Sequence, residues 1–123
     1  MTIERIFSRD LVTVPNDESL LEAAKRMRAS NVSALAVEEE GELVAFITER
    51  DLVRAMAEGA DAVGTQVRDY ATGVLVTADV SDTPADVAKR MLELGIRHLP
   101  VTDESSLVGI ISTRDLLAFA FRR

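Results

Sequence analysis

Residues 47–52 read Ile-Thr-Glu-Arg-Asp-Leu, and residues 111–116 read Ile-Ser-Thr-Arg-Asp-Leu. The second phrase lies 64 positions after the first, since 111 minus 47 is 64, and the same shift aligns other stretches without a gap. Leu-Val-Thr, for example, stands at 11–13 and again at 75–77. A repeat at a fixed period defines the architecture before any single element does. We infer that the chain consists of two copies of one unit.

Each copy predicts the order strand, helix, strand, strand, helix. In the first copy a β-rich run covers 11–14 and ends at Pro15. An apolar stripe at helical spacing follows from Leu20 to Met27. Short polar side chains cap helix starts because they accept free backbone N–H groups. The candidate caps of this helix are Asn16, Asp17 and Ser19.

The second copy has clearer signals for the start and the end of its first helix. Its helix is predicted to start near Thr83, with Pro84 at the first helical position and Gly95 as the stop. The other predicted strands cover 32–37, 43–47, 96–101 and 107–111, the second helices begin at Glu49 and Thr113, and short lead-in helices cover 3–7 and 67–70.

These elements indicate a mixed fold of the α/β (α+β) class. We assign residues 1–59 to the first repeat, 60–66 to a linker and 67–123 to the second repeat. One copy alone buries too little surface to be secure, so the two copies are expected to share a core.

The composition excludes several classes of function. The 123 residues carry a net charge of −7 without a basic tract, which argues against a general nucleic-acid surface. There is no cysteine and His98 is the single histidine, so no disulfide or histidine-rich metal site can form within one chain. No apolar signal region and no apolar run of ~18 residues occurs, so a cytoplasmic location without membrane contact is expected. No Walker loop, GxGxxG phrase or nucleophile elbow occurs, and we do not expect an enzyme.

The doubled Arg-Asp phrases, the stretch Gly-Ile-Arg-His-Leu-Pro-Val at 95–101 and the opening Leu-Val-Thr runs resemble a tandem pair of cystathionine-β-synthase-type (CBS) domains, or Bateman module. The resemblance covers essentially the whole chain. It implies two pseudo-symmetric repeats packed sheet to sheet, with two related clefts between them. It also implies an adenosine-type ligand there, namely AMP, ADP, ATP, NAD or S-adenosylmethionine, and no catalytic cofactor.

The family phrase Gly-x-x-Ser/Thr-x-x-Asp usually marks a cleft. It is intact from Gly109 to Asp115, whereas Ala45 replaces the glycine in the copy that ends at Asp51. Glycine lets a backbone approach a ligand, so Ala45 puts a methyl group at that place. A carboxylate accepts hydrogen bonds from two vicinal hydroxyls, and the resemblance therefore implies that Asp51 and Asp115 bind a ribose.

Neighbouring hydroxyl and basic side chains complete the expected site. Thr48 and Ser112 lie three residues before the aspartates and are candidates for ribose or phosphate oxygens. The helix N-terminus beside them favours anions. The same spacing also fits a helix capping box, and we expect both roles together. Further candidates on this first turn are Thr113, Arg50 and Arg114.

Arg97 and His98 form a second cluster. The resemblance implies that basic residues before Leu-Pro-Val meet phosphate, for which a guanidinium fork and an imidazole donor are suited. The matching residues Ser33 and Ala34 carry no charge, so the two clefts are expected to differ in affinity. The alternatives are a structural histidine and a solvent-exposed arginine.

Weaker candidates surround the adenine ring that the resemblance implies. The backbone around Pro100 is expected to frame the ring, and Thr13 and Thr77, at equivalent strand positions, to bond its edge. A threonine in a β-rich run also reflects plain strand preference. The Lys-Arg pairs at 25–26 and 89–90 are interpreted as solvated helix faces.

We expect a stand-alone regulatory or sensor module that binds an adenosine-type ligand and signals through a regulated protein partner or self-association. The family pairs as homodimers through helices, and the apolar side chains of the second helices serve either such a surface or an ordinary core. The alternative function is an interaction or scaffold protein that dimerises without binding a nucleotide. The side chains considered are Leu52, Val53, Ala55, Met56, Leu116, Leu117, Phe119 and Phe121.

Overall fold

The computed structural model describes residues 1–73 and 76–122. The chain forms two compact units. We call Val12–Val74 the first-repeat unit, and Met1–Leu11 together with Leu75–Arg123 the second-repeat unit. Each is described by itself.

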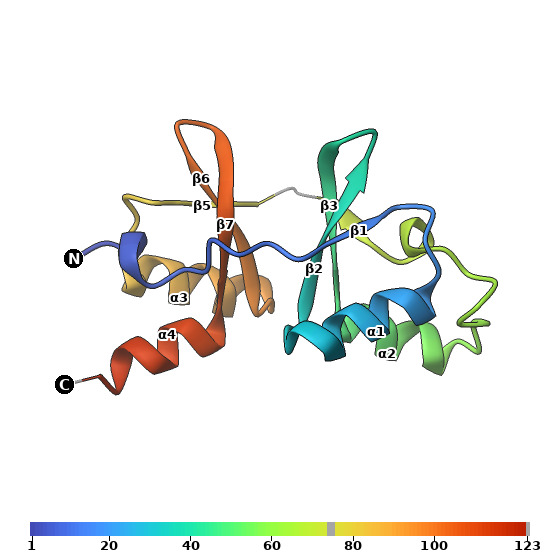
Figure 1. Cartoon of the computed structure of the whole chain (residues 1–123). Coiled ribbons are helices and arrows are strands. Elements are labelled where there is room, and N and C mark those ends of the chain that lie inside the picture. The colour runs from blue at the N-terminus through green and yellow to red at the C-terminus, as the bar shows by residue number, and fades with distance from the viewer. Residues whose placement is uncertain (74–75, 123) are drawn as a thin grey trace. The chain divides into compact units, whose positions relative to one another are not determined.

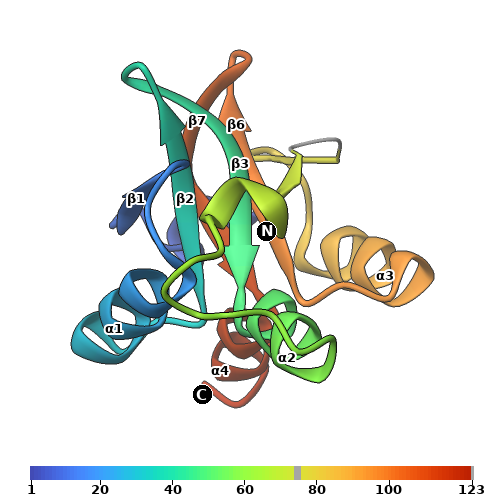
Figure 2. The ribbon, with the colours of Figure 1, turned by 90° about the vertical axis from the view of Figure 1, so that its right-hand side faces the viewer.

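The first-repeat unit holds a sheet in the order β1-β2-β3-β4. Strand β1 is parallel to β2, and the other neighbours are antiparallel. Figure 2 shows α1 and α2 at the end of the β2–β3 hairpin that lies away from its turn. The elements are β1 (Thr13–Pro15), α1 (Leu20–Ser30), β2 (Ala34–Glu39), β3 (Glu42–Thr48), α2 (Glu49–Ala57), the 3-10 helix η2 (Val67–Asp69) and β4 (Thr72–Gly73).

The second-repeat unit repeats this order with a sheet β5-β6-β7 (Figure 1). The predicted succession of strand, helix, strand, strand and helix is confirmed in both copies, and the fold is of the mixed α/β class. Strand β4 was not predicted. The elements are the 3-10 helix η1 (Ile3–Arg5), β5 (Ala78–Asp79), α3 (Pro84–Leu94), β6 (His98–Asp103), β7 (Ser106–Ser112) and α4 (Thr113–Ala120).

The first helix of each copy begins and ends on local signals. The Ser19 side chain accepts the backbone N–H of Glu22 at 3.1 Å, which settles the cap of α1 among the three predicted candidates. Thr83 caps α3 in the same way. Asn31 at φ 53° and Gly95 at φ 66° end the two helices in the left-handed conformation.

Alternate strand residues supply the core beneath each sheet. In the first-repeat unit Leu35 pairs with Ile47 and Val37 with Ala45, so all four side chains leave the sheet on one face. They meet the apolar stripe of α1 there. The buried cluster comprises Val14, Leu20, Ala23, Met27, Leu35, Val37, Ala45, Ile47, Ala55 and Val67. Its counterpart comprises Ile3, Phe7, Ala78, Val80, Val87, Met91, Leu99, Val101 and Ile111.

The lead-in helices are exchanged between the repeats. Helix η1 opens the first repeat in sequence, yet fully buried Ile3 belongs to the core of the second-repeat unit. Helix η2 opens the second repeat in sequence, yet fully buried Val67 belongs to the core of the first-repeat unit. Backbone bonds fix both, from Ile3 N–H to the Asp82 carbonyl at 2.9 Å and from Val67 N–H to the Glu18 carbonyl at 2.8 Å. The compact units therefore do not coincide with continuous sequence repeats.

The opening strand of the second copy starts later than predicted. In the first copy Ala36 N–H donates to the Val12 carbonyl at 2.9 Å. The residue 64 positions after Ala36 is Pro100, which has no N–H, so this bond has no counterpart. Thr77 accordingly lies outside β5, and its predicted strand position is wrong. Leu75, in the same predicted run, lies outside the described residues.

Across the described ranges, no helix combines the length and apolar character that crossing a membrane requires. Over the same ranges, no group of three or more acidic, histidine or cysteine side chains is arranged to hold a metal ion.

Candidate functional site

Both second helices begin in a complete capping box. Thr48 N–H donates to Asp51 Oδ2 at 2.9 Å, and Asp51 N–H donates to Thr48 Oγ1 at 3.3 Å. Ser112 N–H donates to Asp115 Oδ2 at 2.8 Å, and Asp115 N–H donates to Ser112 Oγ at 3.2 Å. The capping role expected of these four residues is confirmed.

The cap also defines what each box can still offer to a ligand. The hydroxyl hydrogen is used, because Thr48 Oγ1 donates to Asp51 Oδ2 at 3.2 Å and Ser112 Oγ donates to Asp115 Oδ2 at 3.0 Å. Each hydroxyl oxygen retains one acceptor lone pair. Each aspartate retains its second oxygen, Oδ1, outside the cap. A sugar hydroxyl is a donor that suits both of these acceptors.

The two Oδ1 atoms have different surroundings. Asp51 is buried, and its Oδ1 lies 3.6 Å from Nη2 of Arg54. Asp115 is half-buried, and the residue matching Arg54 is Ala118. Within residues 1–73 and 76–122, no hydrogen bond or ion pair reaches Asp115 Oδ1. The second-repeat carboxylate is therefore the more accessible acceptor.

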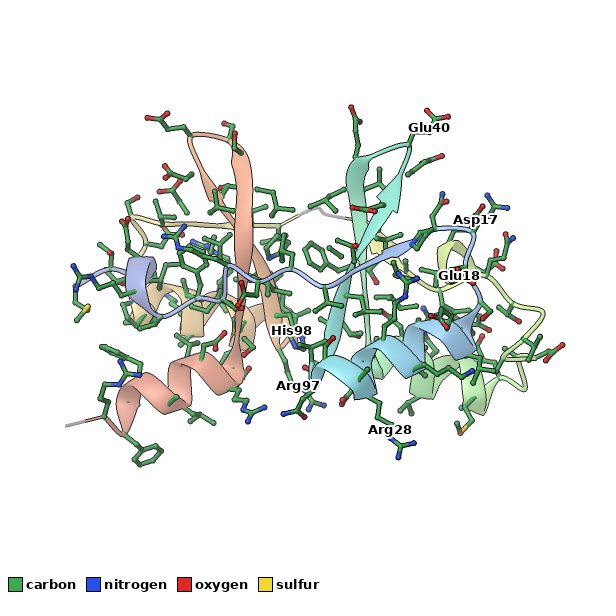
Figure 3. All side chains as sticks on the ribbon, viewed as in Figure 1. Asp17, Glu18, Arg28, Glu40, Arg97 and His98 are labelled. Atoms are coloured by element: carbon green, nitrogen blue, oxygen red, sulfur yellow. The ribbon has the colours of Figure 1, made fainter. Side chains whose placement is uncertain are left out.

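Arg97 and His98 lie at the same end of the hairpin as the second capping box (Figure 3). His98 is the register partner of Ser112, and such partners carry their side chains on one face of the sheet. The Arg97 carbonyl accepts the backbone N–H of Thr113 at 2.9 Å. Arg97 is exposed and His98 half-buried.

The first-repeat unit has the same frame without the basic side chains. Ala34 is the register partner of Thr48, and the Ser33 carbonyl accepts the backbone N–H of Glu49 at 3.0 Å. The positive charge that Arg97 brings beside the second box is therefore missing beside the first, as the sequence predicted.

The other residues of the first turn divide into two groups. The Thr113 hydroxyl lies 3.4 Å from the Arg97 carbonyl oxygen and 3.7 Å from Met91 Sδ, so it bonds within its own unit. Arg50 and Arg114 are exposed at the helix start, where a guanidinium can meet an anion without leaving water.

The three residues expected near an adenine ring differ in accessibility. Thr13 is half-buried in β1, Pro100 is buried in β6, and Thr77 is exposed ahead of β5. The structure brings Pro100 and His98 together on one strand, whereas Thr77 belongs to no strand.

Two helix arginines were assigned wrongly to solvated faces. Arg26 Nη1 donates to the Thr13 carbonyl at 2.9 Å, and Arg90 Nη1 donates to the Thr77 carbonyl at 3.0 Å. Each also pairs with an acid, Arg26 with Glu22 at 3.3 Å and Arg90 with Asp82 at 3.1 Å. Their recurrence 13 residues after each threonine was the available signal.

The glycine of the family phrase has a packing reason in its own unit. A Cβ atom at Gly109 would lie 2.7 Å from two ring carbons of Phe7 and would clash with the Ser8 carbonyl oxygen. Ser8 and Ile110 exchange two backbone hydrogen bonds of 2.9 Å, which hold the N-terminal segment against this strand (Figure 1). The close approach that Gly109 permits is therefore to residues 7 and 8, and a role toward a ligand stays a prediction.

The first-repeat unit fills the corresponding contact between its lead-in segment and its third strand with different side chains. The residue matching Phe7 is Ala71, and the residue matching Gly109 is Ala45. Ala71 packs against a core that includes Ala45. A large side chain beside glycine in one unit is thus replaced by two alanines in the other. This compensation was readable from the aligned repeats, but only with the knowledge that the lead-in segments lie against the third strand of each copy.

A family model for the CBS domain matches residues 3–58 and again residues 67–122. The chain belongs to the CBS-domain family. The two matched stretches make it a tandem CBS protein, as the resemblance predicted.

Relatives of this CBS protein differ in length. It is 32% identical over 116 residues to the CBS domain-containing protein YhcV of Bacillus subtilis, covering 94% of this chain and 82% of YhcV. It is 33% identical over 116 residues to the uncharacterized protein MJ1225 of Methanocaldococcus jannaschii, covering 94% of this chain but only 41% of that protein.

A solved structure adds ligand information about a similar protein. The CBS domain pair of protein MJ0100, solved in complex with 5′-methylthioadenosine and S-adenosyl-L-methionine, matches with a TM-score of 0.85 and 27% identity. The match covers 98% of this chain and 95% of the other.

Proposed function

We propose that this CBS protein is a regulatory module that binds an adenosine-type ligand through its capping-box aspartates, Asp115 more tightly than Asp51. The observation that carries the proposal is the Asp115 carboxylate: Oδ2 caps α4, while no described residue pairs with Oδ1. A half-buried carboxylate oxygen with an adjacent hydroxyl acceptor suits the two hydroxyls of a ribose.

The similar MJ0100 pair supports this ligand class. Its two ligands, 5′-methylthioadenosine and S-adenosyl-L-methionine, share an adenosine group and lack phosphate. In this chain Arg97, His98 and Arg114 stand at the end of the second-repeat unit that holds Asp115. These basic groups favour a phosphate-bearing member of the class, namely AMP, ADP, ATP or NAD.

The role we propose is binding rather than catalysis. A ligand changes the state of a protein only by binding two states with different affinity. The output therefore passes to a regulated protein partner or to a second copy of the chain.

The surface proposed for homodimer formation is narrower than the sequence predicted. Ala55 is 2% exposed and belongs to the core of the first-repeat unit, and Leu52 is partly buried against that core. Leu116 is partly buried against the core of the second-repeat unit. The exposed apolar side chains of α2 and of the α4 segment are Val53, Met56, Leu117 and Phe121. A contiguous patch of exposed apolar side chains is typical of an association surface, and we propose that these side chains contribute to one.

Isothermal calorimetry tests the ligand class directly. The wild-type chain is titrated with AMP, ADP, ATP, NAD, S-adenosylmethionine and 5′-methylthioadenosine, and its melting temperature is measured with each. We expect at least one ligand to give a saturable heat of binding and to raise the melting temperature. The 2′-deoxy analogue of that ligand should bind more weakly, because it lacks one hydroxyl donor to the carboxylate. A panel without heat or melting shift would refute the proposal.

The first-repeat unit favours a second candidate function. Asp51 is buried beside Arg54, and no basic side chain replaces Ser33 or Ala34. A chain in which neither box binds a nucleotide would serve as an interaction or scaffold protein. Self-association measured by analytical ultracentrifugation, unchanged by every ligand of the panel, would favour that function.

A further inference from the structure

Arg54 joins the candidate ribose carboxylate of the first-repeat unit to the segment that follows η2. Its Nη2 lies 3.6 Å from Asp51 Oδ1 and donates to the Tyr70 carbonyl oxygen at 3.0 Å. Its guanidinium carbon lies 4.7 Å from the centre of the Tyr70 ring, within the range of a cation–π contact. One side chain on α2 thus contacts an acid, a carbonyl and an aromatic face.

Tyr70 is held at its other end by the same helix. Its hydroxyl donates to Glu58 Oε1 at 2.8 Å, and Glu58 is the C-cap residue directly after α2. The ring packs against the core of the unit. The position of Tyr70 therefore depends on α2 through Arg54 at one point and Glu58 at another.

The second-repeat unit has no equivalent of this arrangement. The residue matching Arg54 is Ala118, and the residue matching Tyr70 is Ile6. No described side chain brings a cation to Asp115 Oδ1. The two candidate sites thus differ by one cation placed directly at the acceptor oxygen.

We infer that Arg54 lowers the affinity of the first-repeat site and couples its occupancy to Tyr70. This inference rests on the proposed function, because it requires a ligand hydroxyl to bond Asp51. A donor that takes Asp51 Oδ1 displaces the guanidinium, since both approach the same oxygen. The displaced guanidinium then leaves the carbonyl and ring of Tyr70 without their partner.

The size of the effect follows from the geometry. The Arg54 side chain is 49% exposed, and its distance to Oδ1 exceeds hydrogen-bond length. An exposed ion pair of this kind changes an equilibrium by about two- to five-fold. We therefore expect removal of Arg54 to tighten the first-repeat site by about that factor.

The test isolates the first-repeat site with Asp115→Asn and compares Arg54→Ala with Arg28→Ala in that background. Arg28 is exposed on α1 and points away from the sheet (Figure 3), so it controls for loss of one positive charge. AMP and 5′-methylthioadenosine are titrated by calorimetry. We expect Arg54→Ala to lower both Kd values about two- to five-fold and Arg28→Ala to leave them unchanged.

Three outcomes would overturn the inference. Equal Kd values in Arg54→Ala and its parent would show that Arg54 does not compete. A higher Kd for AMP alone in Arg54→Ala would assign Arg54 to phosphate binding. Absence of binding both in the Asp115→Asn parent and in its Arg54→Ala variant would remove the first-repeat site. The proposed function fails only if the wild-type chain binds no ligand of the full panel, whereas the inference fails when wild type binds and these variants behave as described, so the two failures are distinguishable.

The coupling has its own readout. Tyr70 is the only tyrosine and the chain has no tryptophan, so intrinsic fluorescence reports this ring alone. We expect ligand to change the fluorescence in wild type and not in Asp51→Asn or Arg54→Ala. The reverse substitution, Ala118→Arg, is expected to weaken the second-repeat site about two- to five-fold. A ligand-induced change that persists in Asp51→Asn would refute the coupling.

Discussion

Asp51 and Asp115 occupy the same position of the same capping box, yet they are in different electrostatic environments. Asp51 is buried with a guanidinium 3.6 Å from its outer oxygen, while Asp115 is half-buried with an alanine in place of that arginine. Beside Asp115 stand Arg97 and His98, and beside Asp51 stand two uncharged residues. Duplication preserved the backbone frame and the cap, whereas the charged groups beside the two carboxylates, which we propose set the ligand affinity, diverged.

A substitution at Gly109 should produce the largest difference between the repeats. Gly109→Ala places a methyl group against Phe7 and the Ser8 carbonyl, so we expect a loss of about 1–3 kcal/mol in the free energy of unfolding. The converse change Ala45→Gly causes no clash; it adds backbone freedom in a strand and removes one buried methyl group, and should cost about 1 kcal/mol. Urea denaturation of both variants measures the difference.

A double substitution sharpens this result. Phe7→Ala combined with Gly109→Ala imitates the alanine pair of the first-repeat unit and should cost less than the sum of the two single changes. Additive losses would show that the Phe7 ring is not the group that excludes a side chain at 109.

The helix arginines should behave alike in the two repeats, which tests whether the shared frame is real. Arg26→Met and Arg90→Met each remove an ion pair and a bond to a backbone carbonyl, that of Thr13 or of Thr77, and we expect each to lower the free energy of unfolding by about 1 kcal/mol. Arg28→Met, on an exposed side chain, serves as the control and should change stability by less than about 0.5 kcal/mol. An effect on one repeat only would contradict the equivalence.

The smallest expected effect is on the titration of Tyr70. The hydrogen bond to Glu58 raises the pKa of the Tyr70 phenol, and the Arg54 cation partly offsets it. Glu58→Gln should therefore lower this pKa toward the usual value of about 10, and Arg54→Ala should raise it further. Because the raised pKa belongs to the folded state, its stabilising effect is present below pH about 10 and is lost as the phenol ionises. Ultraviolet absorbance of the single tyrosine measures both changes, and a shift of opposite sign in either variant would contradict the network.

More of the fold than of the candidate site could be predicted from the sequence. The constant shift between the copies predicted both sets of elements and both capping boxes. Helix starts can be predicted because they depend on residues close in sequence, such as Ser112 and Asp115. It did not predict β4 or the exchange of the lead-in helices, since these depend on contacts between segments far apart in the chain. The shorter β5 could have been predicted from Pro100, because proline lacks the N–H that Ala36 donates to the opening strand of the first copy.

Long side chains were the least predictable part of the site. The polarity pattern of the helices predicts that Arg26 and Arg90 are solvated, yet their side chains are long enough to reach the backbone carbonyls of Thr13 and Thr77. Arg54 gave no sequence signal of its own, because its three contacts come from the helix start and from a segment beyond the linker. The only sequence sign of a special role for Arg54 is that the matching residue of the second copy is Ala118.

Calorimetry of the tightest-binding ligand on wild type, Asp51→Asn and Asp115→Asn tests the inequality of the two carboxylates most directly. Asparagine keeps an oxygen for the cap and replaces the outer oxygen by a donor, so ligand binding changes more than helix stability. We predict that Asp115→Asn weakens the tighter site at least about tenfold, as expected for a lost bond to a charged acceptor, while Asp51→Asn leaves that site unchanged. Equal losses in the two variants, or none in either, would show that the two carboxylates do not differ as ligand-binding groups.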